Sequence, residues 1–122
     1  MKSQAYRMAM LYDFYGDLLT PRQKEFYDLY YNDDLSLSEI AENYDITRQG
    51  VRDIIVRAER ALEDIEEKTG LIKRYHRTRV ALSSLRDLCQ QVRALNEERF
   101  SDNGLDDLIQ QMTTVIDDME RE

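Results

Sequence analysis

Apolar residues recur at intervals of three and four along nearly the whole chain, the spacing that places them on one side of a helix. The first such segment runs from Tyr6 to Leu19. The residues on its apolar side are Met8, Leu11, Tyr12, Tyr15 and Leu18. No segment of useful length alternates with the period of a β-strand. The pattern therefore predicts an all-α fold.

Two capping boxes mark the starts of further helices. Thr20 is followed three residues later by Gln23, and Ser36 stands in the same relation to Glu39. In such a pair, each side chain accepts a hydrogen bond from the other residue's backbone N–H. We expect a second helix after Thr20 and a short third helix over residues 37–44.

A tight turn and a long helix follow. Asp45 stands where the turn requires a left-handed backbone, which Asp tolerates better than most residues. Thr47 is positioned as the N-cap of the next helix, and Gly70 as its C-terminal stop. The helix spans about five turns. Its apolar residues are Val51, Ile55, Ala58, Leu62 and Ile65.

The last third of the chain predicts two more helices that form a hairpin. Its first apolar set is Ala81, Leu85, Leu88, Val92 and Leu95. The second set, after a break at residues 101–104, is Leu105, Leu108, Met112, Val115 and Met119. Both sets follow heptad spacing, so they form either the core of the hairpin or a dimer interface. We expect a homodimer, because so small a module needs a partner subunit to bury every apolar stripe.

The composition excludes several kinds of site. One cysteine, Cys89, and one histidine, His76, permit neither an internal disulfide nor a four-ligand zinc site. The common glycine-rich nucleotide-binding motifs are absent. We therefore expect a binding protein that is not an enzyme, with no cofactor, no metal and no small-molecule substrate.

The distribution of hydrophobic residues argues against a membrane protein. No apolar run approaches the ~20 residues that a membrane-spanning helix needs. The first ten residues lack the hydrophobic region of a signal peptide. We expect a cytoplasmic protein that does not contact membranes.

The net charge is −8, which argues against non-specific coating of nucleic acid. Only residues 46–80 are basic, with nine Lys and Arg against six Asp and Glu. Any polyanion should therefore bind through this segment, with few phosphate contacts.

Residues 37–54 have the pattern of a helix-turn-helix motif. Ala41 is the small residue where the two helices cross, Asp45 is the turn residue, and Ile46, Val51 and Ile54 pack back against the first helix. The polar residues left on the outside of the second helix are Arg48, Gln49, Arg52, Asp53 and Arg57. The alternative is a packing unit that no longer binds nucleic acid.

The candidate nucleic-acid-binding residues follow from this motif. Arg48, Gln49 and Arg52 lie in the first two turns of the second helix, the part that normally enters a major groove. Further candidates for phosphate contacts are Arg57, Arg74 and Arg77. The alternative for the basic segment around residue 74 is a solvated helix start balanced by nearby acids.

The sequence also indicates a protein interface. Phe14 lies off the main apolar stripe of its helix, and aromatic residues are enriched at interface hot spots. Asp33 and Asp34 belong to an acidic group that suits a basic partner. We take these three residues as candidates for a partner interface.

Several segments together are more specific than a generic helix-turn-helix. They are Leu11-Tyr-Asp-Phe-Tyr15, Leu18-Leu-Thr20, Gln23, Leu29-Tyr-Tyr31, Asp33-Asp34, Ser36-Leu37, Glu39-Ile-Ala-Glu42, Arg48-Gln49, Val51 and Arg57. In these segments the chain closely resembles the YlxM-type family of small bacterial helix-turn-helix proteins, over roughly residues 6–75. It departs from the family at Gly50, where Ala is usual, and at Thr47, where Ser is usual.

The resemblance implies a fold and a function. The family looks like the region-four module of sigma factors, which recognises promoter DNA. Its genes lie beside those of Ffh and FtsY, so an accessory or regulatory role in the signal recognition particle pathway is implied. The partners would then be duplex DNA or signal recognition particle RNA, and Ffh or FtsY. The alternatives are a dimeric DNA-binding transcription regulator and a protein-protein adaptor for Ffh without direct nucleic-acid contact.

The predicted architecture has two parts. We interpret residues 1–70 as a helix-turn-helix domain with a long recognition helix that resembles a DNA- or RNA-binding module. Residues 71–122 are a C-terminal helical extension. No linker rich in Pro, Gly or Ser separates the two. The extension is therefore expected to belong to the same folding unit or to form a dimer interface.

Overall fold

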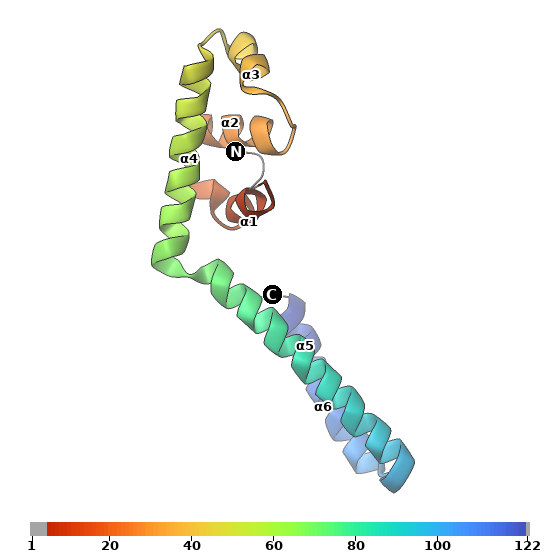
Figure 1. Cartoon of the computed structure of the whole chain (residues 1–122). Coiled ribbons are helices and arrows are strands. Elements are labelled where there is room, and N and C mark those ends of the chain that lie inside the picture. Colours follow the sequence, from red (N-terminus) through yellow and green to blue (C-terminus); the bar gives the residue numbers. More distant parts are fainter. Residues whose placement is uncertain (1–4, 122) are drawn as a thin grey trace. The chain divides into compact units, whose positions relative to one another are not determined.

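The computed structural model describes residues 5–121, which are almost entirely helical (Figure 1). The helices are α1 (Ala5–Tyr15), α2 (Pro21–Tyr31), α3 (Leu37–Tyr44), α4 (Arg48–Thr69), α5 (Leu71–Leu95) and α6 (Asn103–Arg121). Two short helical segments, η2 (Gly16–Leu18) and η3 (Asn96–Phe100), follow α1 and α5. No strand occurs in residues 5–121, so the all-α prediction is confirmed. None of these helices is long and apolar enough to cross a membrane.

The chain divides into two compact units, Met1–Ile72 and Lys73–Glu122. The first unit holds α1 to α4 and the first two residues of α5. The second holds the remainder of α5, together with η3 and α6.

The first unit is organised around α4, against which α1, α2 and α3 all pack (Figure 1). Val51 and Ile55 of α4 are completely buried against α2 and α3. Ala58 and Leu62, further along α4, are completely buried against α1 and α2. A single helix therefore joins two hydrophobic clusters.

The predicted helix starts are confirmed. The Thr20 hydroxyl accepts the Gln23 N–H at 3.2 Å, and the Gln23 side chain accepts the Thr20 N–H at 3.1 Å. Ser36 and Glu39 form the same reciprocal pair at the start of α3. These bonds satisfy backbone donors that the first turn of a helix leaves without a partner.

The prediction for the first helix is wrong at its end. α1 stops at Tyr15, and Gly16–Leu18 form a tighter 3-10 turn. This turn advances more per residue than an α-helix does, so it rotates the following side chains. Leu18 is therefore 69% exposed, and Leu19 is buried in its place.

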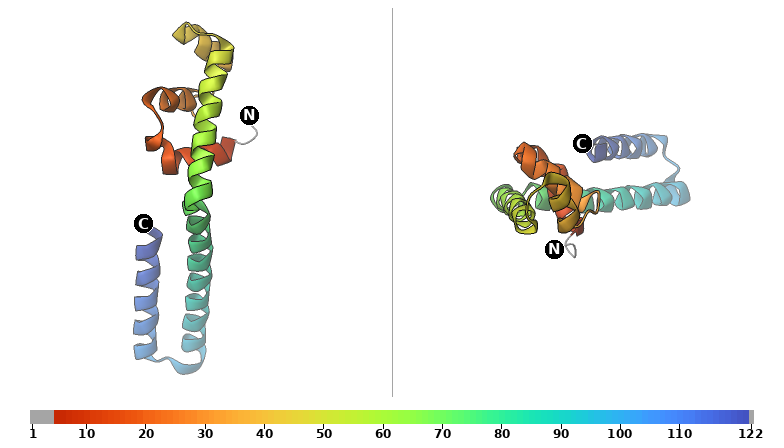
Figure 2. Two further views of the ribbon diagram at one scale, coloured as in Figure 1. Left: turned by 90° about the vertical axis from the view of Figure 1, so that its left-hand side faces the viewer. Right: turned by 90° about the horizontal axis from the view of Figure 1, so that it is seen from above.

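In the second unit α5 and α6 form the predicted antiparallel hairpin (Figures 1 and 2). Its core is the cluster of Leu82, Cys89, Ile109 and Ile116, with Leu105 partly buried against it. Most other residues of the two apolar sets that the sequence predicts for the hairpin are exposed. Leu85, Leu88, Val92, Leu95, Leu108, Met112, Val115 and Met119 are each 38–57% exposed. They are therefore not the core of the hairpin.

Two polar residues, Arg86 of α5 and Asn96 at the start of η3, follow the buried stripe of α5 at helical spacing. Arg86 reaches across to α6, with its Nη2 at 2.6 Å from Asp117 Oδ1 and 3.0 Å from Glu120 Oε2. Asn96, completely buried, holds the turn through bonds to the Asp102 carbonyl at 2.9 Å and to Asp106 Oδ1 at 2.8 Å. These bonds favour burial of the Leu82 and Cys89 stripe, because they turn that side of α5 toward α6.

The buried hydroxyl of Tyr27 provides a test of the first unit. It donates a hydrogen bond to the Met8 carbonyl, and the Tyr27 ring stacks on Tyr12 with centroids 5.2 Å apart. Tyr27→Phe should lower the free energy of unfolding by about 1 to 3 kcal/mol, because the buried carbonyl loses its donor. Urea unfolding measures this difference. Tyr6→Phe is the control, since Tyr6 is 79% exposed and the change should alter stability by less than about 0.5 kcal/mol. Equal effects of the two substitutions would contradict the packing described here.

Candidate nucleic-acid interface

The turn between α3 and α4 has the geometry of a helix-turn-helix. Asp45 adopts the predicted left-handed backbone, with φ 54° and ψ 45°. The Ile46 N–H donates to the Ala41 carbonyl at 3.1 Å, and the Asp45 N–H donates to the Glu42 carbonyl at 3.4 Å. This pair of bonds is a Schellman motif, which ends α3 and redirects the chain into α4.

Small and branched apolar residues hold α3 against α4. Ala41 is 6% exposed, and both Ile40 and Val51 are completely buried. Ile46 and Ile54 are partly buried against the same cluster. The packing roles predicted for the motif are therefore confirmed, and α4 is held with the other side of its first turns in solvent.

The predicted recognition residues occupy that exposed surface. Arg48, Gln49 and Arg52 are all exposed. Gln49 Nε2 donates to Asp53 Oδ1 at 2.9 Å. Within residues 5–121, neither Arg48 nor Arg52 forms an ion pair. Both guanidinium groups are thus available to an anion.

The N-terminus of α4 itself carries a partial positive charge. Thr47 caps the helix, its hydroxyl accepting the Gly50 N–H at 3.0 Å. The first turn carries no acidic residue. The partial positive charge of the helix N-terminus is therefore not offset by a carboxylate within the helix, and it adds to the charge of Arg48 and Arg52.

Arg57 does not share the surface of the other candidates on α4. It is exposed, but it follows Arg52 by five residues. At 3.6 residues per turn, this separation rotates its side chain by about 140° around the helix. The structure therefore brings Arg48 and Arg52 together and places Arg57 on another side of α4.

Arg74 and Arg77 belong to the second unit. Both are exposed on α5, and they are three residues apart, so they are neighbours on the helix surface. They form a local basic pair in that unit, separate from the helix-turn-helix unit.

The predicted partner-interface residues come from two places in the first unit. Phe14 lies on α1, is 37% exposed, and has its ring tilted against that of Tyr15 with centroids 6.1 Å apart. Asp33 and Asp34 lie in the turn between α2 and α3, and both are exposed. Asp34 has a left-handed backbone, with φ 56°.

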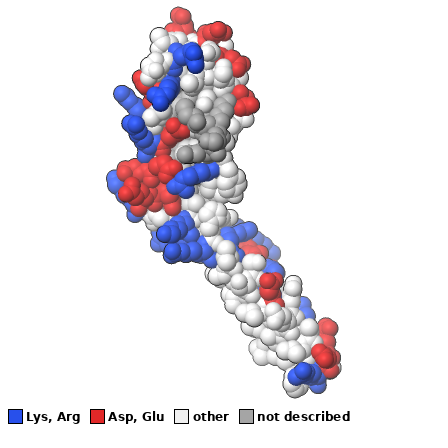
Figure 3. All heavy atoms as spheres, in the orientation of Figure 1, with Lys and Arg blue, Asp and Glu red and all other residues white. Residues whose placement is uncertain are grey.

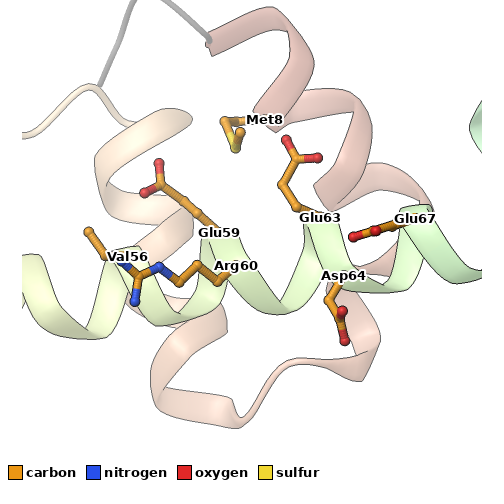
Figure 4. Close-up of a pocket in the computed structure, with 7 residues that line it drawn as sticks. All are labelled: Met8, Val56, Glu59, Arg60, Glu63, Asp64 and Glu67. Carbon is orange, nitrogen blue, oxygen red and sulfur yellow. The ribbon is translucent and has the colours of Figure 1, made fainter.

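Along α4 the charge changes sign. Figure 3 shows Lys and Arg atoms over the upper part of this helix and Asp and Glu atoms gathered over its lower part. The lower part borders an open groove of about 520 Å³ between α1 and α4 (Figure 4). The lining residues are Met8, Val56, Glu59, Arg60, Glu63, Asp64 and Glu67.

Sequence analysis missed this groove. The spacing of Glu59, Glu63 and Glu67 by four residues was the available signal, because it places them on one side of a helix. The position of Met8 beside them depends on how α1 packs, which local sequence does not reveal.

Most of the carboxylates in the groove already have partners. Arg7 binds both Glu63 oxygens, with Nε to Oε1 at 2.8 Å and Nη2 to Oε2 at 2.6 Å. These hydrogen bonds lower the pKa of Glu63 from its ordinary value. Glu59 accepts a bond from the Tyr31 hydroxyl, and Asp64 pairs with Lys68 at 2.9 Å. No group of three or more His, Cys, Asp or Glu side chains among residues 5–121 is arranged to hold a metal ion.

Comparison with known proteins agrees with this geometry. Residues 2–102 match the model of the UPF0122 family, described as "Putative helix-turn-helix protein, YlxM / p13 like". The chain belongs to this family.

Members of the family from several bacteria are similar over much of their length. A UPF0122 protein of Geobacillus kaustophilus is 51% identical over 87 residues, which are 71% of this chain and 79% of the relative. A UPF0122 protein of a Thermoanaerobacter species is 41% identical over 112 residues, 92% of each chain. One from Listeria welshimeri is 37% identical over 115 residues, 94% of this chain and 99% of the relative.

The cap of α4 can be tested directly. Thr47→Ala removes the acceptor of the Gly50 N–H and should lower the free energy of unfolding by about 1 kcal/mol. Thr47→Ser retains a hydroxyl at the same place and should be close to wild type. Thermal unfolding of the three proteins measures the order. A similar loss for Ser and Ala would show that the hydroxyl does not cap the helix.

Proposed function

We propose that the protein is a cytoplasmic, non-enzymatic nucleic-acid-binding protein that uses the start of α4 as its recognition surface. The observation that carries this proposal is the availability of Arg48 and Arg52. Both are exposed without an ion pair in residues 5–121, at the positive end of the second helix of a helix-turn-helix. Membership of a family described as helix-turn-helix supports the same function.

The three candidate recognition residues would make different contacts, because their side chains differ in charge and in hydrogen-bonding groups. Arginine donates two parallel hydrogen bonds to guanine or to a phosphate, and glutamine can bond an adenine edge. Arg48 and Arg52 thus supply charge and base contacts, and Gln49 supplies a neutral contact to one side of this pair. The N-terminus of α4 favours a phosphate beside these residues.

Affinity should be modest and dependent on salt. The chain has a net charge of −8, so long-range repulsion opposes binding. Arg57 on α4, and the neighbouring pair of Arg74 and Arg77 on α5, are further candidates for phosphate contacts. The number of contacts is small, and the salt dependence of binding should be correspondingly shallow.

We further propose an accessory or regulatory role in the signal recognition particle pathway. This part rests on the resemblance to the YlxM-type family and not on the geometry. The expected ligand is signal recognition particle RNA, with Ffh or FtsY as a protein partner. The first alternative is a dimeric transcription regulator that binds duplex DNA.

The second alternative is an adaptor that docks a basic surface of Ffh without touching nucleic acid. The groove lined by carboxylates on α4 favours it, as do exposed Phe14, Asp33 and Asp34. Against it, Glu59, Glu63 and Asp64 are already bonded within the first unit. We therefore place it second.

Fluorescence anisotropy separates these possibilities. Labelled signal recognition particle RNA is titrated with the protein, with unlabelled duplex DNA as competitor, in the presence and absence of Ffh. Arg48→Ala/Arg52→Ala should weaken binding at least about 30-fold and reduce the slope of log affinity against log salt by about two. The loss follows from removing two of the few phosphate or base contacts.

The control Arg99→Ala/Arg121→Ala removes the same charge from exposed positions in the second unit and should bind like wild type. If both double variants weaken binding equally, binding depends only on net charge, and this result would contradict the proposed surface. RNA binding seen only with Ffh present would favour the adaptor. Complete displacement by duplex DNA would favour the transcription regulator.

A further inference from the structure

The second unit exposes an apolar surface that its own fold does not use. The hairpin buries Leu82 and Cys89 of α5 against Ile109 and Ile116 of α6. Beside this seam each helix carries another apolar stripe. On α5 the stripe is Leu85, Leu88, Val92 and Leu95, and on α6 it is Leu108, Met112, Val115 and Met119. We call these eight residues the outer face.

The outer face is one continuous surface. At about 100° of rotation per residue, the exposed stripe on each helix is offset from its buried stripe by a similar angle and in the same rotational sense. α5 and α6 run antiparallel and side by side (Figure 2). In antiparallel helices, equal offsets of the same sense bring both stripes to one side of the pair. The eight side chains therefore form a single strip along the hairpin.

This strip is uncharged. On the outer sides of the helices it is bordered by Ser84 and Gln91 of α5 and by Gln111 and Asp118 of α6, and Asp118 pairs with Arg121 at 3.4 Å. The ion pairs of Arg86 lie in the seam between the helices instead. Figure 3 shows an uncharged band along the hairpin, with charged atoms gathered along one edge and near the two ends. Such a surface has no charged side chain with which to bind a phosphate or a strongly charged peptide. Its partner must therefore be apolar.

The area matches a dimer interface. Each of the eight side chains is 38–57% exposed. Eight large apolar side chains that are each about half exposed form a patch on the order of several hundred Å², comparable to the ~300–600 Å² of the largest apolar patch on a typical monomer and to the ~800 Å² that each partner buries in a stable complex.

A second copy of the chain has the right complementary surface. The heptad spacing of the outer face suits helices that pack at about 20° in a four-helix bundle. An uncharged face also lets two copies meet without placing like charges at the contact, although residues 81–122 carry ten Asp and Glu against four Lys and Arg. A two-fold axis that lies in the plane of the contact, perpendicular to the helices, would pair each stripe with its equivalent in the other copy.

We propose that the outer faces of two hairpins pack together as a four-helix bundle, so that the protein is a dimer with two helix-turn-helix units. This assigns the homodimer expected from the sequence to one surface. The dimer does not depend on nucleic-acid binding. If the helix-turn-helix does bind nucleic acid, two linked units gain affinity for any ligand that engages both.

Sedimentation equilibrium of the full chain over a range of micromolar concentrations tests the proposal. The wild type should have twice the 14.5 kDa mass of one chain. Leu88→Glu/Val115→Glu places two charges in the outer face and should weaken dimerisation at least about 100-fold, giving a mass of 14.5 kDa. The control Ser83→Glu/Gln110→Glu adds the same charge at exposed positions outside the outer face and should remain a dimer.

Circular dichroism verifies that each variant keeps its helices. If the glutamate variant loses its fold, the milder Leu88→Ala/Val115→Ala variant should dissociate at a higher concentration than wild type. A wild-type protein that stays monomeric throughout the range would overturn the proposal. A trimer or larger assembly would overturn it, as would a folded glutamate variant that remains dimeric.

Discussion

Burial of one side of α4 is the constraint on which the first unit depends. Val51, Ile55, Ala58 and Leu62 are each completely buried, at intervals of three and four residues. Each larger side chain contributes about 1.5 to 3 kcal/mol when removed from water. The first two hold α3 and thus form the helix-turn-helix, and the last two hold α1 and α2. Because one side of α4 is buried along this length, the residues at the start of its other side remain in solvent, where the proposed recognition surface lies.

The charged residues on the polar side of α4 differ in their partners between the two ends of the helix. Near the N-terminus Arg48 and Arg52 have no ion pair within residues 5–121. Toward the C-terminus, Glu59 and Glu63 are bonded to Tyr31 and Arg7, which come from other helices. The acidic end thus stabilises the packing of the first unit, whereas Arg48 and Arg52 at the basic end remain exposed. This division is compatible with the proposed nucleic-acid-binding surface on a chain whose net charge is −8.

The features that the sequence predicted correctly are those with local causes. The Ser36 cap, the left-handed Asp45 and the exposure of Arg48 depend on neighbouring residues and on helical period. The core of the hairpin was not predictable in this way, because α5 and α6 each carry two adjacent apolar stripes. The choice between them involves contacts across the hairpin, such as those of Arg86 and Asn96. The lack of an ion pair at Arg48 and Arg52 also depends on which acids other elements bring near.

The most direct test of the central claim is a backbone amide NMR titration of the full-length protein with a short DNA duplex and with an RNA hairpin of equal charge. We predict saturable shifts concentrated at residues 47–52, at the start of α4, for at least one of the two ligands. Shifts confined to α1 and the groove on the C-terminal half of α4, or no saturable shift with either ligand, would contradict a recognition role for this helix.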